Sequence, residues 1–226
     1  MVAASVFTRC SVLQFQIIPV THYQQNCTLL WCDETLDAAV VDPGGDIERI
    51  LAVVAEKGVN LRQILLTHGH MDHIGGTAAL IAELQLPVIG PHADDLFWID
   101  LLPQQAQMMG FKPVAGFTPN QLLNHGDKVR VGNAELEVLH CPGHTPGHVI
   151  FYNRAAQLAL VGDVLFKGSI GRTDFPRGNH ADLINAIRTR VLPLGDAVRF
   201  IPGHGPMSTF GHERLSNPFV ADKNYG

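Results

Sequence analysis

A short segment of the sequence is rich in residues that bind metal ions. The stretch HGHMDH at residues 68–73 places three histidines and one aspartate within six positions, directly after the apolar run ILLT. Side chains two apart in an extended segment point to the same side, so His68 and His70 should face one region. Asp72 and His73 follow where the chain turns. Because unpaired titratable groups are costly to bury at a strand end, this spacing predicts a metal site.

Three more polar residues occupy matching places farther along the chain. His144 in HCPGH, Asp163 in LVGD and His204 in FIPGH each follow an apolar, strand-like run. If the four loops meet at one edge, a bound cation would offset the cost of burying these groups. Imidazole and carboxylate ligands without a thiolate suit Zn²⁺ or another borderline divalent ion. Seven ligands are too many for one tetrahedral site, so the sequence predicts two metal ions.

The composition limits the alternatives. The chain has 226 residues, 46% of them hydrophobic, and nothing divides it in two, so we expect an extension at residues 1–13 and a single domain at 14–226. A net charge of −5 without Lys/Arg clusters argues against nucleic-acid binding. The N-terminus lacks the pattern of a signal peptide or a membrane anchor, and the oligomeric state is left open. Scattered cysteines fit free thiols in the cytoplasm; they are Cys10, Cys27, Cys32 and Cys141.

Hydrophobic periodicity and turn residues predict strands followed by a helix, twice over. This order favours two sheets packed together with helices outside, an αββα sandwich. Asp46 is expected to cap the first helix, and Gly58 to end it. Residues 92–124 are harder to interpret; helical pieces are plausible, and the Phe97–Phe111 cluster favours core or subunit contact over a substrate wall. The other expected helices span 74–84, 181–191 and 210–216, and the expected strands start near Phe15 and span 27–31, 38–41, 64–67, 88–90, 128–131, 134–139, 149–152, 158–161 and 198–201.

The order of these motifs resembles the metallo-β-lactamase superfamily. H-x-H-x-D-H is followed by an isolated His, an isolated Asp and a late Gly-His. The segments GDVLFKGSIGRTDFPRGN and PGHGPMSTFGHERLSNPF are similar to the short bacterial glyoxalase II-like hydrolases. The resemblance implies an αββα sandwich of two mixed β-sheets flanked by helices, with a dinuclear metal centre. The implied ligands are His68, His70 and His144 for one metal, Asp72, His73 and His204 for the other, and Asp163 as the bridge.

The resemblance also implies a reaction. Two neighbouring cations would convert a shared water into a bridging hydroxide near neutral pH, and this hydroxide would attack a carbonyl group. A thiol has a pKa of about 8.5, so it can leave as the thiolate with little need for protonation. The implied activity is hydrolysis of S-D-lactoylglutathione or a related acyl thioester, with Asp72 and Asp163 as catalytic carboxylates. Zn²⁺ is the expected metal, and Fe and Mn are the alternatives.

Substrate contacts are expected on the loop after Asp163. Long glyoxalase II enzymes hold glutathione with a C-terminal helical domain, and the 22 residues after His204 are not expected to form such a domain. Arg and Lys side chains can clamp carboxylates, although Arg172 and Asp174 could equally pair with each other and stiffen the loop. The candidate substrate-binding residues are Lys167, Ser169, Arg172 and Arg177.

Other activities of the same superfamily stay open. The main alternative is a mononuclear iron persulfide dioxygenase, which would use His68, His144 and Asp163 alone and shares a similar G-R-T-D-F stretch. The PGHG context of His204 favours the hydrolases. A lactonase, esterase or nuclease ranks lower. The remaining histidines are expected at the surface or in capping positions, except His140 and His148, which are expected at most to support the ligands.

Overall fold

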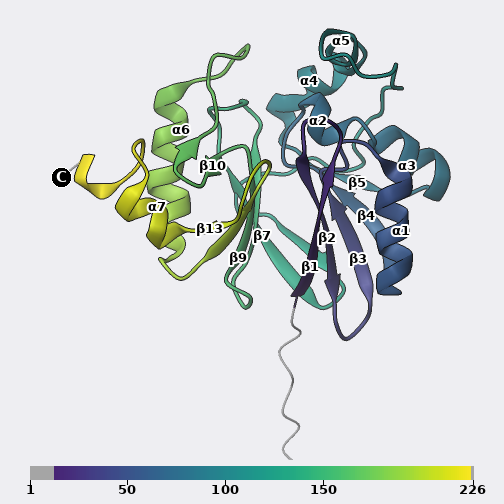
Figure 1. The fold of residues 1–226 in the computed structure, drawn as a ribbon, viewed down its shortest axis with the longest axis horizontal. Coiled ribbons are helices and arrows are strands. Elements are labelled where there is room, and N and C mark those ends of the chain that lie inside the picture. The colour runs from purple at the N-terminus through teal and green to yellow at the C-terminus, as the bar shows by residue number, and fades with distance from the viewer. Residues whose placement is uncertain (1–12, 225–226) are drawn as a thin grey trace, which may run out of the picture.

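The computed structural model describes residues 13–224, in which two β-sheets pack face to face and helices cover both outer faces (Figure 1). The predicted αββα sandwich is therefore confirmed. The predicted N-terminal extension falls outside the described residues except for Leu13, which begins the first strand. The predicted single domain stays a prediction. Between residues 13 and 224, no helix combines the length and the apolar character needed to cross a bilayer.

Both large sheets are mixed. The first contains, in spatial order, β1 (Leu13–Val20), β2 (Gln25–Cys32), β3 (Asp37–Val41), β4 (Asn60–Leu65) and β5 (Val88–Ile89). The second contains β13 (Ser208–Thr209), β12 (Arg199–Pro202), β9 (Leu158–Gly162), β8 (Val149–Asn153), β7 (Ala134–His140) and β6 (Lys128–Val131). In the first sheet β1, β2 and β3 are antiparallel, and β3, β4 and β5 are parallel. In the second sheet β9 and β12 are parallel and the other pairs are antiparallel.

Helices flank the sheets and crowd one edge. In Figure 1, α1 (Ile47–Lys57) and α3 (Thr77–Leu84) lie beside the first sheet, and α6 (His180–Ala186) and α7 (Phe210–Ser216) beside the second. The short helices α2 (Met71–Ile74), α4 (Leu96–Asp100) and α5 (Leu102–Met108) lie at the upper edge. A π-helical turn at Ile187–Val191 continues α6, and 3₁₀ turns span Ala93–Asp95, Leu192–Leu194 and Asp222–Asn224.

Three details differ from the sequence expectations. Asp46 is the N-cap residue of α1 as expected, but its side chain makes no capping hydrogen bond; its carboxylate instead accepts a hydrogen bond from the Thr21 amide at 2.7 Å. The expected helix 74–84 is interrupted, because Gly76 donates its amide hydrogen to the Pro43 carbonyl. A small hairpin of β10 (Leu165–Phe166) and β11 (Ser169–Ile170) was not predicted, since two-residue strands carry no periodic signal.

The interior has three apolar layers. The middle layer lies between the sheets and includes Leu30, Leu65 and Phe151, while an outer layer packs each sheet against its helices. β8 and β9 are buried along their whole length, whereas β6 alternates exposed and buried residues. Strands covered on both faces need continuous apolar sequence, which explains VIFYN and LALVG.

The fold brings the predicted ligand loops to one edge of the sandwich. The loops follow β4, β7, β9 and β12, and hydrogen bonds join the two sheets there. The Asn26 amide donates to the Gly203 carbonyl at 2.7 Å, and the Val149 amide donates to the Thr67 carbonyl at 2.8 Å. These contacts fix the loops of one sheet against those of the other.

A glycine at this edge permits a close approach. A methyl group at Gly44 would overlap the backbone carbonyl of Asp72. We therefore expect Gly44→Ala to displace the Asp72 turn and to lower the free energy of unfolding by about 1–3 kcal/mol, as overpacking does elsewhere. Urea denaturation in EDTA measures this loss. Gly116→Ala is the matched control, since a methyl group there meets nothing within 4 Å; equal stability of both variants would contradict the prediction.

Candidate metal centre

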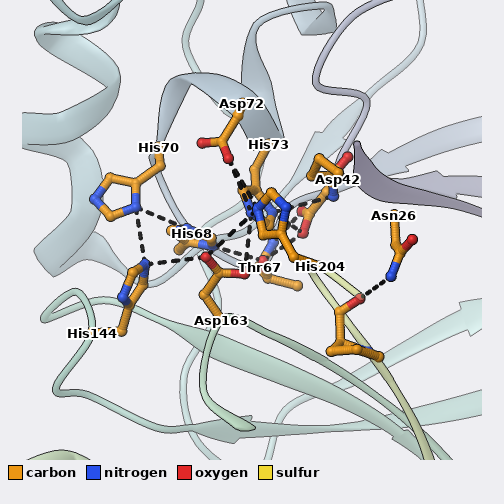
Figure 2. Close-up of polar contacts among 12 residues, drawn as sticks. Asn26, Asp42, Thr67, His68, His70, Asp72, His73, His144, Asp163 and His204 are labelled. Atoms are coloured by element: carbon orange, nitrogen blue, oxygen red, sulfur yellow. Dashed lines mark hydrogen bonds and ion pairs between the residues drawn. The ribbon is translucent and has the colours of Figure 1, made fainter. Parts of the chain in front are cut away.

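All seven predicted ligand residues lie together at this edge of the sandwich (Figure 2). Their donor atoms form two groups, with Asp163 placed between them. The family resemblance implies the same two sets, and their assignment as metal ligands stays a prediction. The first group is His68, His70 and His144, and the second is Asp72, His73 and His204.

In the first group, three imidazole nitrogens converge. His70 Nδ1 lies 3.1 Å from Nε2 of His68 and 3.0 Å from Nε2 of His144. His144 donates its Nδ1 hydrogen to the Arg172 carbonyl. Thr67 donates its hydroxyl hydrogen to Asp42 and so accepts from Nδ1 of His68. The Nε2 lone pairs of His68 and His144 therefore point to one place, where one hydrogen on His70 cannot satisfy both.

The second group repeats this pattern. His73 Nδ1 donates to the Asp42 carboxylate at 2.9 Å, and His204 Nδ1 donates to the Tyr23 carbonyl at 3.2 Å. Their Nε2 atoms consequently face inward. His204 Nε2 lies 3.1 Å from Oδ2 of Asp72, and this carboxylate acts against burial to raise the pKa of His204, so the two atoms need a proton or a metal ion between them. A metal-binding histidine generally donates its outer ring hydrogen to an acceptor in this way.

Asp163 connects the two groups. Its carboxylate oxygens lie 3.3 Å from Nε2 of His73, 3.6 Å from Nε2 of His144 and 3.9 Å from Nε2 of His204. Gly203 allows this approach, because a methyl group there would overlap Oδ1 of Asp163. The geometry places one carboxylate within reach of both donor groups.

Unpartnered buried atoms test whether these residues suit a cation. Nε2 of His73 and Oδ1 of Asp163 both face the donor groups; they are buried, and neither has a hydrogen-bond partner within the described chain. Such atoms normally cost free energy unless something satisfies them. Burial lowers the pKa of His70 to about 3 and lowers the pKa values of His68 and His144, which keeps these rings neutral. Neutral imidazole is the metal-binding form, so the residues present fit divalent metal ions.

The second group carries the negative charge that a dication would neutralise. Burial acts to lower the pKa of His73, but the Asp163 and Asp72 carboxylates raise it well above its usual value. Burial acts to raise the pKa of Asp163, yet neighbouring His73 and His144 lower it strongly, so this carboxyl is ionised at neutral pH. The aspartates are thus available as anionic ligands.

Two supporting residues hold the ligands in place. Asp42 accepts hydrogen bonds from His73, the Thr67 amide and the Thr67 hydroxyl. His148 accepts a hydrogen bond from the Asp163 amide at 3.0 Å, and its ring stacks on His68. Sequence reasoning missed the role of Asp42, although it follows the apolar strand AAVV just as Asp163 follows LALVG.

Asp95 and Gln105 also position ligand loops, and no sequence signal marks them. Asp95 is fully buried and accepts hydrogen bonds from the Gly69 amide, the Thr145 hydroxyl and the Gly147 amide. It therefore connects the His68–His70 loop to the His144 loop. Burial raises its pKa to about 6, although these hydrogen bonds oppose the shift. Gln105 accepts from the Met71 amide and donates to the Gly69 carbonyl.

The donor groups open into a cavity of about 750 Å³. Its lining includes His70, Asp72, His144, Asp163 and His204. Apolar residues also line it, several of them from the segment that was expected to form core or subunit contacts. That expectation was incomplete, because Met109 and Phe111 do pack on the core while cavity-lining side chains come from the same segment. These are Trp98, Leu101, Met108 and Met109.

The four predicted substrate-binding residues are placed differently. Arg172 lines the cavity, but it forms a two-point ion pair with Asp174 at 2.6 Å. Lys167 is exposed and lies outside the cavity lining. Arg177 covers the Phe97 ring, and Ser169 belongs to the β11 hairpin strand. Only Arg172, of these four, reaches the cavity wall.

The three described cysteines lie outside the two donor groups. Cys27, Cys32 and Cys141 are buried free thiols. Cys10 lies outside the described residues.

The sequence and fold of this chain are similar to those of known proteins. The sequence profile of the Metallo-beta-lactamase superfamily matches residues 20–204, and the chain belongs to that family. Hydroxyacylglutathione hydrolase GloC of Haemophilus influenzae is 45% identical over 94% of this chain and 100% of its own length. The fold and the predicted class, a metallohydrolase, are thereby confirmed.

Two solved structures are also similar. The BLEG-1 B3 metallo-beta-lactamase is 35% identical with a TM-score of 0.84, covering 92% of this chain and 99% of the other. TTHA1623, solved in a di-iron-bound form, is 36% identical with a TM-score of 0.83, covering 91% and 100%. Structural likeness extends over nearly the whole chain in both cases.

The Asp95 contacts predict a stability effect. In Asp95→Asn an amide NH₂ replaces one acceptor oxygen, so at least one buried donor from Gly69, Thr145 or Gly147 loses its partner. We expect the free energy of unfolding to fall by about 1–3 kcal/mol. Urea denaturation in EDTA separates this effect from metal binding. Exposed Asp94→Asn serves as the neighbouring control, and a loss no larger in Asp95→Asn than in this control would refute the positioning role.

Proposed function

We propose that this protein is a metal-dependent hydrolase that cleaves acyl thioesters, with S-D-lactoylglutathione as the reference substrate. The observation that carries the proposal is that both donor groups and Asp163 open into one cavity. The similarity to hydroxyacylglutathione hydrolase GloC supports the same substrate class. The cavity has the size of an ordinary small-molecule site.

The proposed roles of the residues follow from their placement. His68, His70 and His144 would hold one metal ion, Asp72, His73 and His204 the other, and Asp163 both. Bound there, divalent ions supply a nucleophile from water near neutral pH and a Lewis acid for a carbonyl oxygen. The protein keeps the donors rigid through Asp42, Thr67 and His148, as described above.

A thioester suits this site because its leaving group needs little help. Water adds to the carbonyl carbon, the C–S bond breaks, and the products are a carboxylate and a thiol. The thiol has a pKa of about 8.5, so it departs largely as thiolate. An amine leaving group would require a positioned proton donor, which makes an amide a more demanding substrate.

The metal is proposed to be a pair of Zn²⁺ ions, since imidazole and carboxylate donors suit zinc. The same donors accept iron, and the di-iron form of TTHA1623 makes iron the principal alternative. The alternative activity, a persulfide dioxygenase, would require one iron ion held by His68, His144 and Asp163. The completeness of the second donor group favours the hydrolase.

Metal counting combined with turnover tests this proposal. We expect two metal ions per chain and hydrolysis of S-D-lactoylglutathione. The loss of thioester absorbance and the release of free thiol measure this hydrolysis. Chelation should abolish the activity, and Zn²⁺ or Fe²⁺ should restore it. One iron per chain with oxygen uptake on glutathione persulfide, and no thioester cleavage, would overturn the proposal.

Substitution of Asp163 tests the bridging role. Asp163→Ala removes the carboxylate that lies within reach of both donor groups. Residues that merely support metal ligands are worth about 10–100-fold, so loss of a bridge should reduce kcat/KM by more than about 100-fold and lower the metal content. Glu56→Ala, on the exposed face of α1, controls for loss of a carboxylate. A metal-replete Asp163→Ala enzyme with near-normal turnover would contradict the assignment.

A further inference from the structure

The cavity beside the donor groups has an extended apolar wall. Trp98 is nearly buried, and its ring centre lies 4.7 Å from that of His70. Phe175 lies 4.5 Å from the His70 ring and 5.5 Å from the His144 ring. The wall therefore begins directly beside the proposed reaction centre. Its apolar members are Trp98, Leu101, Met108, Met109, Phe166 and Phe175.

The wall continues to the surface of the protein. Leu101 is 40% exposed and Met108 is 86% exposed, although both line the cavity. Exposed apolar side chains that continue a cavity wall offer binding area to a ligand that reaches outward. An apolar chain attached to the reacting carbonyl would remain in contact with protein from the donors to the mouth.

Away from the donor groups, the cavity wall offers little to a charged group. Arg172 is the one Lys or Arg side chain among the described cavity-lining residues, and the ion pair with Asp174 occupies its guanidinium from two sides. The same guanidinium covers the Phe175 ring at 4.5 Å. Polar residues such as Tyr23 and Gln105 are neutral, and Gln105 is engaged with backbone groups. A substrate carboxylate would have to compete with Asp174 for its partner.

We propose that the cavity selects acyl thioesters whose acyl group is apolar and uncharged, with Trp98, Met108 and Phe175 as specificity-determining residues. This inference rests on the proposed thioester hydrolysis. Common biological thiols carry polar or charged groups, so the apolar part of such a substrate is its acyl chain. Each thioester is cleaved with one water to a carboxylate and the free thiol, without any further reactant.

The test varies the acyl chain on one neutral thiol. Acetyl, butyryl and hexanoyl thioesters of N-acetylcysteamine are compared with S-D-lactoylglutathione, using the metal-replete enzyme. Burial of a CH₂ group is worth about 0.8 kcal/mol, equivalent to roughly fourfold in kcat/KM. Allowing for incomplete burial at the mouth, the hexanoyl thioester should exceed the acetyl thioester by on the order of 10- to 200-fold.

Three exposed-site variants test the wall and its charge without threatening the fold. Met108→Ala shortens an exposed side chain of the wall and should lower the hexanoyl-to-acetyl ratio severalfold. Leu215→Ala, which is 77% exposed on α7 and outside the cavity lining, should leave the ratio unchanged. Asp174→Asn frees Arg172 from its ion pair and should raise kcat/KM for a glutaryl thioester, whose acyl chain ends in a carboxylate.

The outcomes separate the two proposals. If kcat/KM for S-D-lactoylglutathione or for the acetyl thioester equals that for the hexanoyl thioester, the proposed apolar preference is wrong, while the proposed thioester hydrolysis stands. If none of the thioesters is cleaved by metal-replete enzyme, the proposed function itself is wrong. An acyl-length dependence that Met108→Ala and Leu215→Ala change equally would remove the wall as its cause.

Discussion

The structure depends on the burial of lone pairs that face one another. Four of the five ligand-type histidines use their outer ring hydrogen on a fixed acceptor, which turns the inner nitrogen toward the same region. Carboxylates of Asp72 and Asp163 occupy the remaining sides. Acceptors crowded together away from water repel one another and lose hydration, so the arrangement is stable only with a cation or a proton among them. The sandwich, its strand ends and its close-approach glycines all serve this placement.

The candidate ligands were predictable because their signal is local. His68 to His73 lie within six consecutive residues, and His144, Asp163 and His204 each follow an apolar strand, where an isolated polar residue is conspicuous. The sheets were predictable from alternation and from continuous apolar runs. Asp42 carries the same strand-end signal. Asp95 and Gln105 could not have been identified, because their roles arise from packing between segments remote in sequence.

The apolar wall of the cavity shows where periodicity stops being informative. Trp98, Met108 and Met109 belong to an apolar cluster without a clear period, and the sequence cannot distinguish residues that pack on a core from residues that line a cavity. The loop with Arg172 and Asp174 was similarly ambiguous between rigidity and binding. In the structure the pair is closed, and the arginine carbonyl also fixes His144, so the loop contributes to the metal centre through its backbone.

Each donor group draws on both sheets of the sandwich. His70 and His144 are 74 residues apart in the chain, and Asp72 and His204 are 132 apart. A cation held in either group is therefore a cross-link between the two halves, comparable to a disulfide in the length of chain that it closes. The free energy of metal binding therefore adds to the stability of the folded state. Loss of the metal would thus make the protein more susceptible to proteolysis and would also inactivate it. The abundance of the protein in a cell would therefore follow the metal supply.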